Sequence, residues 1–91
     1  MKNLIAPIIH SNGTGRDELV RQYRDILDGC RDLMAVMRSA TPNGRDYYPI
    51  SPTAGSEARD AYNERYNAVS KMRDEFEGMA LRLQLQLEAK P

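Results

Sequence analysis

Two short polar segments hold the residue types that could bind a ligand. The first, "HSNGTG", covers residues 10 to 15, and the second, "PNGRDYYP", covers residues 42 to 49. Arginine offers a planar fork of donors that matches a phosphate or a carboxylate, and tyrosine offers an aromatic face with a hydroxyl group. These two segments are therefore the places where a binding function is expected.

The second segment combines a basic, an acidic and two aromatic side chains. We expect Arg45 to bind a phosphate or a carboxylate, with Tyr47 and Tyr48 stacking on a ring. Asp46 could orient Arg45 or accept a hydrogen bond from a ligand amine. The alternative is a rigid loop between two prolines, in which the tyrosines cover the end of a bundle and Asp46 pairs with Arg45.

The first segment precedes an expected helix. Gly13 permits backbone conformations that are closed to other residues, and free N–H groups at a helix start, with Arg16 beside them, make a potential anion site. The alternative is that Asn12 and Thr14 only turn the chain and cap the helix. His10 is the only histidine, so it has no second histidine to share a metal with, and a hydrogen-bonding or capping role is expected.

Composition argues against several classes of function. The 91 residues allow one domain, residues 1–91, and 13 basic side chains balance 13 acidic ones. No basic face favours DNA or RNA binding, and a lone cysteine, Cys30, allows neither an intrachain disulfide nor a cysteine metal site. Because no nucleophile–base pair or metal-ligand spacing is present in the sequence, we expect a non-enzymatic protein without metal or cofactor.

The N-terminal residues do not resemble a signal peptide or a membrane span. The apolar run in "MKNLIAPII" is short, Pro7 interrupts it, and polar residues follow. We expect residues 1–13 to form an extended segment, and the protein to act in the cytoplasm, without a membrane partner.

A first helix is expected over residues 15–40. Thr14 and Asp17 have the spacing of a capping box, and opposite charges stand four residues apart, as in Arg24 and Asp28. Apolar residues recur at alternating spacings of four and three, which is typical of a helix packed against another helix. This stripe contains Leu19, Tyr23, Ile26, Cys30, Leu33 and Met37, widened by Val20, Leu27 and Met34.

A second helix is expected over residues 57–88, after a loop at 41–56 and with Ser51 or Ser56 as its cap. It repeats the same spacing at Ala58, Tyr62, Arg65, Val69, Met72, Phe76, Met79 and Leu83. The one polar member of this stripe, Arg65, is expected to extend outwards or to meet an acid of another chain.

These patterns predict an all-α antiparallel helical hairpin. A hairpin has one seam, and the stripe of the first helix is wider than one partner helix covers. Domains this small rarely bury enough apolar surface alone. We therefore expect a homodimer or a higher homo-oligomer, most simply a four-helix bundle.

The two polar segments should lie at opposite ends of a helix roughly 39 Å long, so they cannot meet within one chain. In an antiparallel two-fold dimer, residues 10 to 16 of one chain would approach residues 42 to 49 of the other. The sequence thus suggests two composite sites, and it leaves open whether the segments join in this way or are only caps and turns.

"IHSNGTG" followed by "PNGRDYYP" resembles a family of small phage and prophage proteins without an established activity. Family members read approximately His-Leu-Asn-Gly-Thr-Ser, a helix, Pro-Asn-Gly-Arg-Asp-Tyr-Tyr and a second helix. The present chain has Ser11 and Gly15 where the family pattern has leucine and serine. The resemblance implies a phage-encoded accessory protein, and such proteins often inhibit host defence; it implies no catalytic residue.

Two functions remain in competition. In the first, the protein sequesters a small phosphorylated or nucleotide-type ligand at the composite sites. In the second, it is an interaction module that blocks a host defence protein, or a minor phage component, acting through its outer helix faces.

Overall fold

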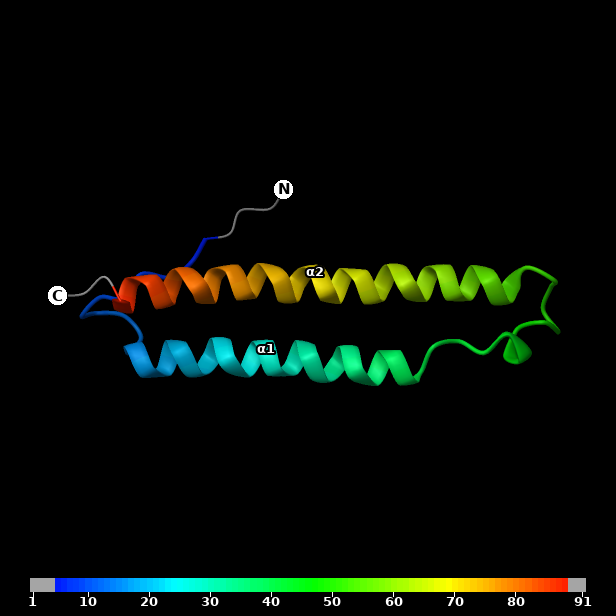
Figure 1. Ribbon diagram of the computed structural model, residues 1–91, viewed down its shortest axis with the longest axis horizontal. Coiled ribbons are helices and arrows are strands. Elements are labelled where there is room, and N and C mark those ends of the chain that lie inside the picture. The colour runs from blue at the N-terminus through cyan, green and yellow to red at the C-terminus, as the bar shows by residue number, and fades with distance from the viewer. Residues whose placement is uncertain (1–4, 89–91) are drawn as a thin grey trace.

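The chain folds as an antiparallel helical hairpin (Figure 1). In the computed structural model, which describes residues 5–88, α1 (Arg16–Ser39) is followed by a 3₁₀ turn, η1 (Gly44–Asp46), and by α2 (Ala54–Glu88). The two long helices lie side by side and run in opposite directions. Within the described range there is no strand, so the all-α hairpin prediction is confirmed. Residues 1–4 of the expected N-terminal segment lie outside that range.

Helix α1 begins at Arg16, one residue later than expected. Gly15 is the N-cap residue, with extended backbone angles (φ −60°, ψ 151°). The hydroxyl of Thr14 therefore stands one residue too early for the expected capping box with Asp17. Asp17 and Glu18 in the first turn still favour the helix, because their negative charges lie near the positive end of its dipole.

The C-terminal end of α1 is held by hydrogen bonds to its last carbonyl groups. The Ala40 N–H group donates to the Met37 carbonyl oxygen at 3.1 Å, and the Ser39 hydroxyl donates to the Val36 carbonyl oxygen at 2.8 Å. A third bond comes from α2, where the Tyr62 hydroxyl also donates to the Met37 carbonyl oxygen, at 2.9 Å. Carbonyl groups that a helix end leaves unpaired are thus satisfied partly by the other helix.

Helix α2 begins at Ala54, earlier than the expected residue 57. The Thr53 hydroxyl donates to the Glu57 carboxylate at 2.8 Å, and the Thr53 carbonyl accepts from the Glu57 N–H group and the Ser56 hydroxyl, each at 3.0 Å. These bonds close the first helical turn around Thr53 rather than around Ser51 or Ser56.

The interface between the helices is a narrow seam. Within residues 5–86 the buried apolar side chains are Leu19, Met34 and Leu83. Tyr23 and Phe76 meet edge to face with ring centroids 6.1 Å apart, a favoured geometry for aromatic pairs. These contacts fix which turns of α1 face which turns of α2.

The seam departs from the expected heptad pattern in the second half of α1. Leu33 is 47% exposed, whereas Met34 is buried. A straight helix drifts by about 20° per heptad from a strict seven-residue repeat, so over the two heptads from Leu19 the position of Leu33 turns away from α2 and that of Met34 turns towards it. On α2, Met72 is 43% exposed and Arg65 is exposed as well.

The segment before α1 is fastened to the end of α2 by one side chain. The Gln86 amide nitrogen donates to the Pro7 carbonyl oxygen at 2.7 Å, and the Ile9 N–H group donates to the Gln86 amide oxygen at 3.0 Å. Gln86 therefore pairs with the backbone of this segment as a neighbouring strand would.

The hairpin is far more elongated than a globular domain of its length. Its extents are 64 × 24 × 20 Å and its radius of gyration is 18.9 Å, against about 12 Å for a compact chain of this size. Its accessible surface of 6898 Å² exceeds the roughly 5400 Å² of a typical monomer of this mass. Among the described residues, neither helix has the length and apolar character needed to cross a membrane.

Candidate ligand-binding site

Residues 10 to 13 form a turn in which a histidine ring covers a glycine. The Gly13 N–H group donates to the His10 carbonyl oxygen at 3.2 Å. A Cβ atom placed on Gly13 would lie 2.7 Å from His10 Nε2, closer than real contacts allow. Gly13 does not have a positive φ, so it serves no unusual backbone angle here, and a side chain at this position would require the exposed His10 ring to move aside.

The polar side chains around this turn face solvent. Asn12, Thr14 and Arg16 are all exposed, as is His10. Arg16 Nε lies 3.9 Å from the Asp17 carboxylate, a long contact between two well-exposed side chains that contributes little to stability. Arg16 is thus available to a ligand at low energetic cost.

The loop at residues 42–49 is organised by one asparagine. The Asn43 side chain accepts from the Arg45 N–H group at 3.0 Å, and the Asn43 carbonyl accepts from the Asp46 N–H group at 3.0 Å. The Gly44 carbonyl then accepts from the N–H groups of Tyr47 and Tyr48 at 3.0 and 3.1 Å. Asn43 is therefore the N-cap of η1, a role that asparagine favours because its short side chain reaches the backbone two residues on.

The η1 turn is braced against the start of α2 by two glycines. A Cβ atom on Gly55 would lie 3.3 Å from the Gly44 Cα atom, and one on Gly44 would lie 3.5 Å from Arg59 Nη1. A side chain at Gly55 would require the Gly44 backbone to shift by a few tenths of an ångström, whereas one at Gly44 would make an ordinary contact with Arg59. The loop thus has a fixed backbone, although it connects two helices.

On this fixed backbone, three of the four predicted side chains point to solvent. Arg45, Asp46 and Tyr48 are exposed, and Tyr48 is 72% exposed. Tyr47 is half-buried, which agrees with the alternative in which a tyrosine covers the end of the hairpin. Sequence reasoning treated the two tyrosines alike, and only the structure distinguishes them.

The predicted site residues fall into two groups that one chain does not bring together. Residues 10 to 16 precede α1 and residues 42 to 49 follow it, and Figure 1 shows them at opposite ends of the hairpin. The 24 residues of α1 span about 36 Å at a rise of 1.5 Å per residue. A joint site therefore needs a second copy of the chain.

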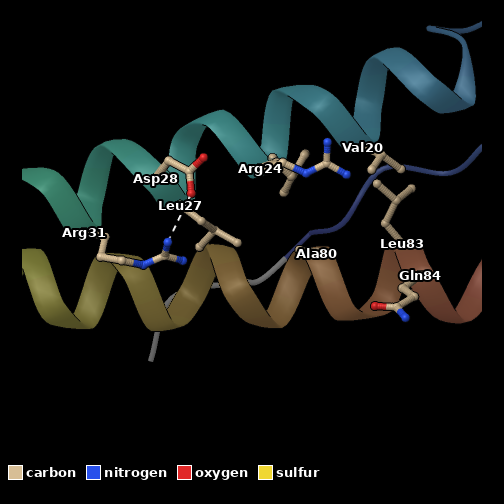
Figure 2. A pocket seen from close by; sticks show the side chains of 9 residues that line it. Val20, Arg24, Leu27, Asp28, Arg31, Ala80, Leu83 and Gln84 are labelled. Carbon is tan, nitrogen blue, oxygen red and sulfur yellow. Dashed lines mark hydrogen bonds and ion pairs between the residues drawn. The ribbon is translucent and has the colours of Figure 1, made fainter.

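A groove lies between α1 and α2, in the half of the hairpin that contains the start of α1 and the end of α2 (Figure 2). It has a volume of about 480 Å³. Its apolar floor is lined by Val20, Leu27, Ala80 and Leu83, and its rim carries the charged residues Arg24, Asp28 and Arg31. A shallower hollow adjoins it across Leu27, Ala80 and Gln84 and is bordered by Asp74, Glu77, Gly78 and Leu81.

Sequence reasoning missed the importance of this groove. Arg24 and Asp28 were expected to pair on an outer face, but both line the groove, and Asp28 pairs with Arg31 at 3.2 Å. A signal was present in the seven-residue spacing of Val20 and Leu27, which places a second apolar row beside the seam. The pairing of Gln86 with the N-terminal segment carried no such signal.

The strongest charge network lies near the start of α1. Arg21 donates to the Glu18 carboxylate through two of its nitrogens and to Asp25 at 3.2 Å. The hydrogen bonds from Arg21 lower the pKa of the Glu18 carboxyl. Because these groups are exposed, the network orders the surface of α1 more than it stabilises the fold.

Comparison with known proteins finds no matching family model, no matching curated protein and no matching solved structure. Within residues 5–88, no group of three or more His, Cys, Asp or Glu side chains could hold a metal ion. The geometry of the two polar segments and of the groove is therefore the basis for assigning a function.

Proposed function

We propose that this protein is a non-enzymatic, phage-encoded accessory protein that binds and sequesters a small phosphorylated or nucleotide-type ligand. Each site is composed of residues 42–49 of one subunit and residues 10–16 of another. The protein works in the cytoplasm of the host cell, where removal of a nucleotide signal would weaken a host defence response. The phage origin follows from the resemblance of the two polar segments.

The observation that carries this proposal is the division of roles within the second segment. Asn43 and Gly44 hold the backbone of η1, whereas Arg45, Asp46 and Tyr48 extend into solvent. A loop that only connected two helices would not need a fixed backbone carrying an exposed arginine and an exposed tyrosine. Rigid presentation of side chains reduces the ordering cost of binding.

The chemistry of these side chains favours a nucleotide-type ligand. The Arg45 guanidinium can bind a phosphate through two parallel hydrogen bonds, and the Tyr48 ring offers a stacking surface for a base. Asp46 can accept from an exocyclic amine. From the second subunit, Arg16 and the free N–H groups at the start of α1 add donors for the same anionic ligand.

Native mass spectrometry of the protein freshly purified from its expression host tests this proposal. We expect an oligomer carrying an additional mass of a few hundred daltons per site. In the double variant Arg45→Ala/Tyr48→Ala, the added mass should be lost while the melting temperature stays within about 2 °C of the wild type, because both side chains are exposed.

A matched control is Arg65→Ala, which removes an exposed arginine of α2 outside both polar segments. This variant should retain the ligand. Retention of the ligand by the double variant would contradict the assignment of the site, and a large fall in its melting temperature would favour a purely structural role for the loop.

A second candidate function rests on a different observation. Leu33 and Val36 in the last two turns of α1, and Met72 in the middle of α2, are apolar and remain 43–62% exposed. Apolar side chains exposed on helices can bind a partner protein, and here the partner would be a host defence protein or a phage component. Substituting Leu33 and Val36 with serine would abolish such an interaction and leave ligand binding at the composite sites unchanged.

A further inference from the structure

The groove face of the hairpin has the chemistry of a protein–protein interface. Its centre is apolar, with Leu27 and Ala80 lining both the groove and the adjoining hollow. Charged side chains surround this centre, with Arg24, Asp28 and Arg31 on the α1 side (Figure 2). An apolar centre with a polar rim is the usual anatomy of an interface between proteins.

The charges on α1 are arranged so that the face can bind a copy of itself. Arg24 and Asp28 stand one turn apart on the same side of α1, with Leu27 between them in sequence. A two-fold axis at the level of residue 26, midway between Arg24 and Asp28 and one residue from Leu27, would place Arg24 of each chain level with Asp28 of the other. Asp28 would then accept from its own Arg31, as it does here at 3.2 Å, and from Arg24 of the second copy. A two-fold interface requires this kind of reciprocal complementarity.

We infer that the groove face is the surface on which a second copy of this chain docks, antiparallel, with Leu27 close to the two-fold axis. This inference deepens the proposed function. It rests on that proposal in one respect, namely that a second subunit is required. It names the interface and the charge pairs that set its register.

The position of Leu27 connects this interface with the composite sites. Leu27 lies at the middle of α1, which runs from Arg16 to Ser39. An antiparallel copy centred on Leu27 therefore brings the start of α1 in one chain level with the end of α1 in the other. The turn at residues 10–15 of one subunit then approaches the segment that leads from Ala40 of the other subunit into η1.

The exposed area of the hairpin agrees with an interface of this kind. Its surface exceeds that of a typical monomer of this mass by about 1500 Å², and a standard interface covers about 800 Å² on each partner. One face of the hairpin is therefore enough to accommodate a stable dimer. The reciprocal charges favour a second copy over an unrelated partner.

A charge-exchange experiment tests the inference. Arg24→Asp places acids opposite acids in the dimer, and Asp28→Arg places cations opposite cations, so each variant alone should dissociate at least about tenfold more readily than the wild type. When the two variants are mixed, both contacts between positions 24 and 28 again join opposite charges, one with the native signs and one with the signs exchanged, so a 1:1 heterodimer should form. Native mass spectrometry distinguishes the heterodimer by its mass, and circular dichroism verifies that each variant is helical.

Cross-linking provides a second test that does not weaken the interface. In a Cys30→Ser background, Leu27→Cys should form an intermolecular disulfide on mild oxidation, because the two thiols would lie close to the axis. Val36→Cys in the same background is the control, since Val36 is 62% exposed and lies on the opposite side of α1 at about 100° per residue.

The outcomes separate this inference from the proposed ligand site. Three results would overturn the inference: a monomeric wild type, dimers of unchanged affinity in both charge variants, or cross-linking at Val36 instead of Leu27. The groove would then be assigned to a partner of different sequence. A dimer that cross-links through Leu27 but retains no ligand would support the interface and contradict the proposed function.

Discussion

Two tyrosines one turn apart on α2 hold the C-terminal end of α1. The Tyr62 hydroxyl donates to the Met37 carbonyl oxygen at 2.9 Å, and Arg38 Nη1 donates to the Tyr66 hydroxyl at 2.6 Å. The first bond gives the Met37 carbonyl oxygen, which also accepts from the Ala40 N–H group, a second donor from the other helix. Both rings thus link the helices at the loop end of the hairpin, where the seam contains few fully buried side chains.

Removal of one hydroxyl group tests this role. Tyr62→Phe keeps the ring but deletes the bond to Met37, so the free energy of unfolding should fall by about 1 kcal/mol, which lowers the melting temperature of a domain of this size by about 4–8 °C. Tyr48→Phe is the matched control, because Tyr48 is 72% exposed, and its effect should stay within about 0.5 kcal/mol. Equal melting temperatures for the two variants would show that the Tyr62 bond does not stabilise the hairpin.

At the scale of single residues, sequence reasoning identified polar candidates but not their individual roles. Asn43 and Arg45 belong to the same motif, yet Asn43 caps η1 while Arg45 faces solvent. The difference arises from the backbone conformation of the turn, which a motif does not specify. Gly13 was expected to serve an unusual backbone angle, but its φ is not positive and it instead lies under the exposed His10 ring.

At the scale of the helices, apolar spacing predicted that two helices exist and that they pair. It did not predict that Met34 replaces Leu33 in the seam, because the drift between the helical and heptad repeats accumulates over several turns. Spacing also carried no information on the start of α2, where hydrogen bonds of Thr53 extend the helix to Ala54.

Two helical glycines provide a test of local packing. Nothing lies within 4 Å of a Cβ atom placed on Gly29, so Gly29→Ala should stabilise α1 by about 0.5–1 kcal/mol through reduced backbone freedom in the unfolded chain. Gly55→Ala adds the same methyl group 3.3 Å from the Gly44 Cα atom, and displacement of η1 should offset the gain. Chemical denaturation measures both, and a larger stabilisation by Gly55→Ala would contradict the proposed bracing of the loop.

The attachment of the N-terminal segment to α2 depends on one amide group. Gln86→Glu keeps an acceptor for the Ile9 N–H group but removes the donor to the Pro7 carbonyl oxygen, and it places a carboxylate against that oxygen. Hydrogen exchange of the Ile9 amide should accelerate by about tenfold, because the segment opens more often. The Leu19 amide, which donates to the carbonyl oxygen of the N-cap residue Gly15 at 3.0 Å, should be unaffected; unchanged exchange at Ile9 would argue against the Gln86 attachment.

At the scale of the whole molecule, the shape of the chain is the clearest reason to expect assembly. Only three apolar side chains among residues 5–86 are buried, and the radius of gyration of 18.9 Å is that of a rod rather than of a globule. A core this small supplies little of the hydrophobic stabilisation that offsets the conformational entropy of folding. The stability of the hairpin should therefore depend on a partner.

A chain that is stabilised by a second copy has a melting temperature that depends on protein concentration, because dimer formation shifts the folding equilibrium towards the folded state by mass action. A hundredfold rise in protein concentration should raise the melting temperature of the wild type by several degrees. Leu27→Asp places a charge at the centre of the groove face and should abolish this concentration dependence. The control Val36→Asp changes an exposed position outside the groove and should preserve it. A wild-type melting temperature that is independent of concentration would mean that the isolated hairpin supports its own fold, and that neither the interface nor the composite sites are needed for stability.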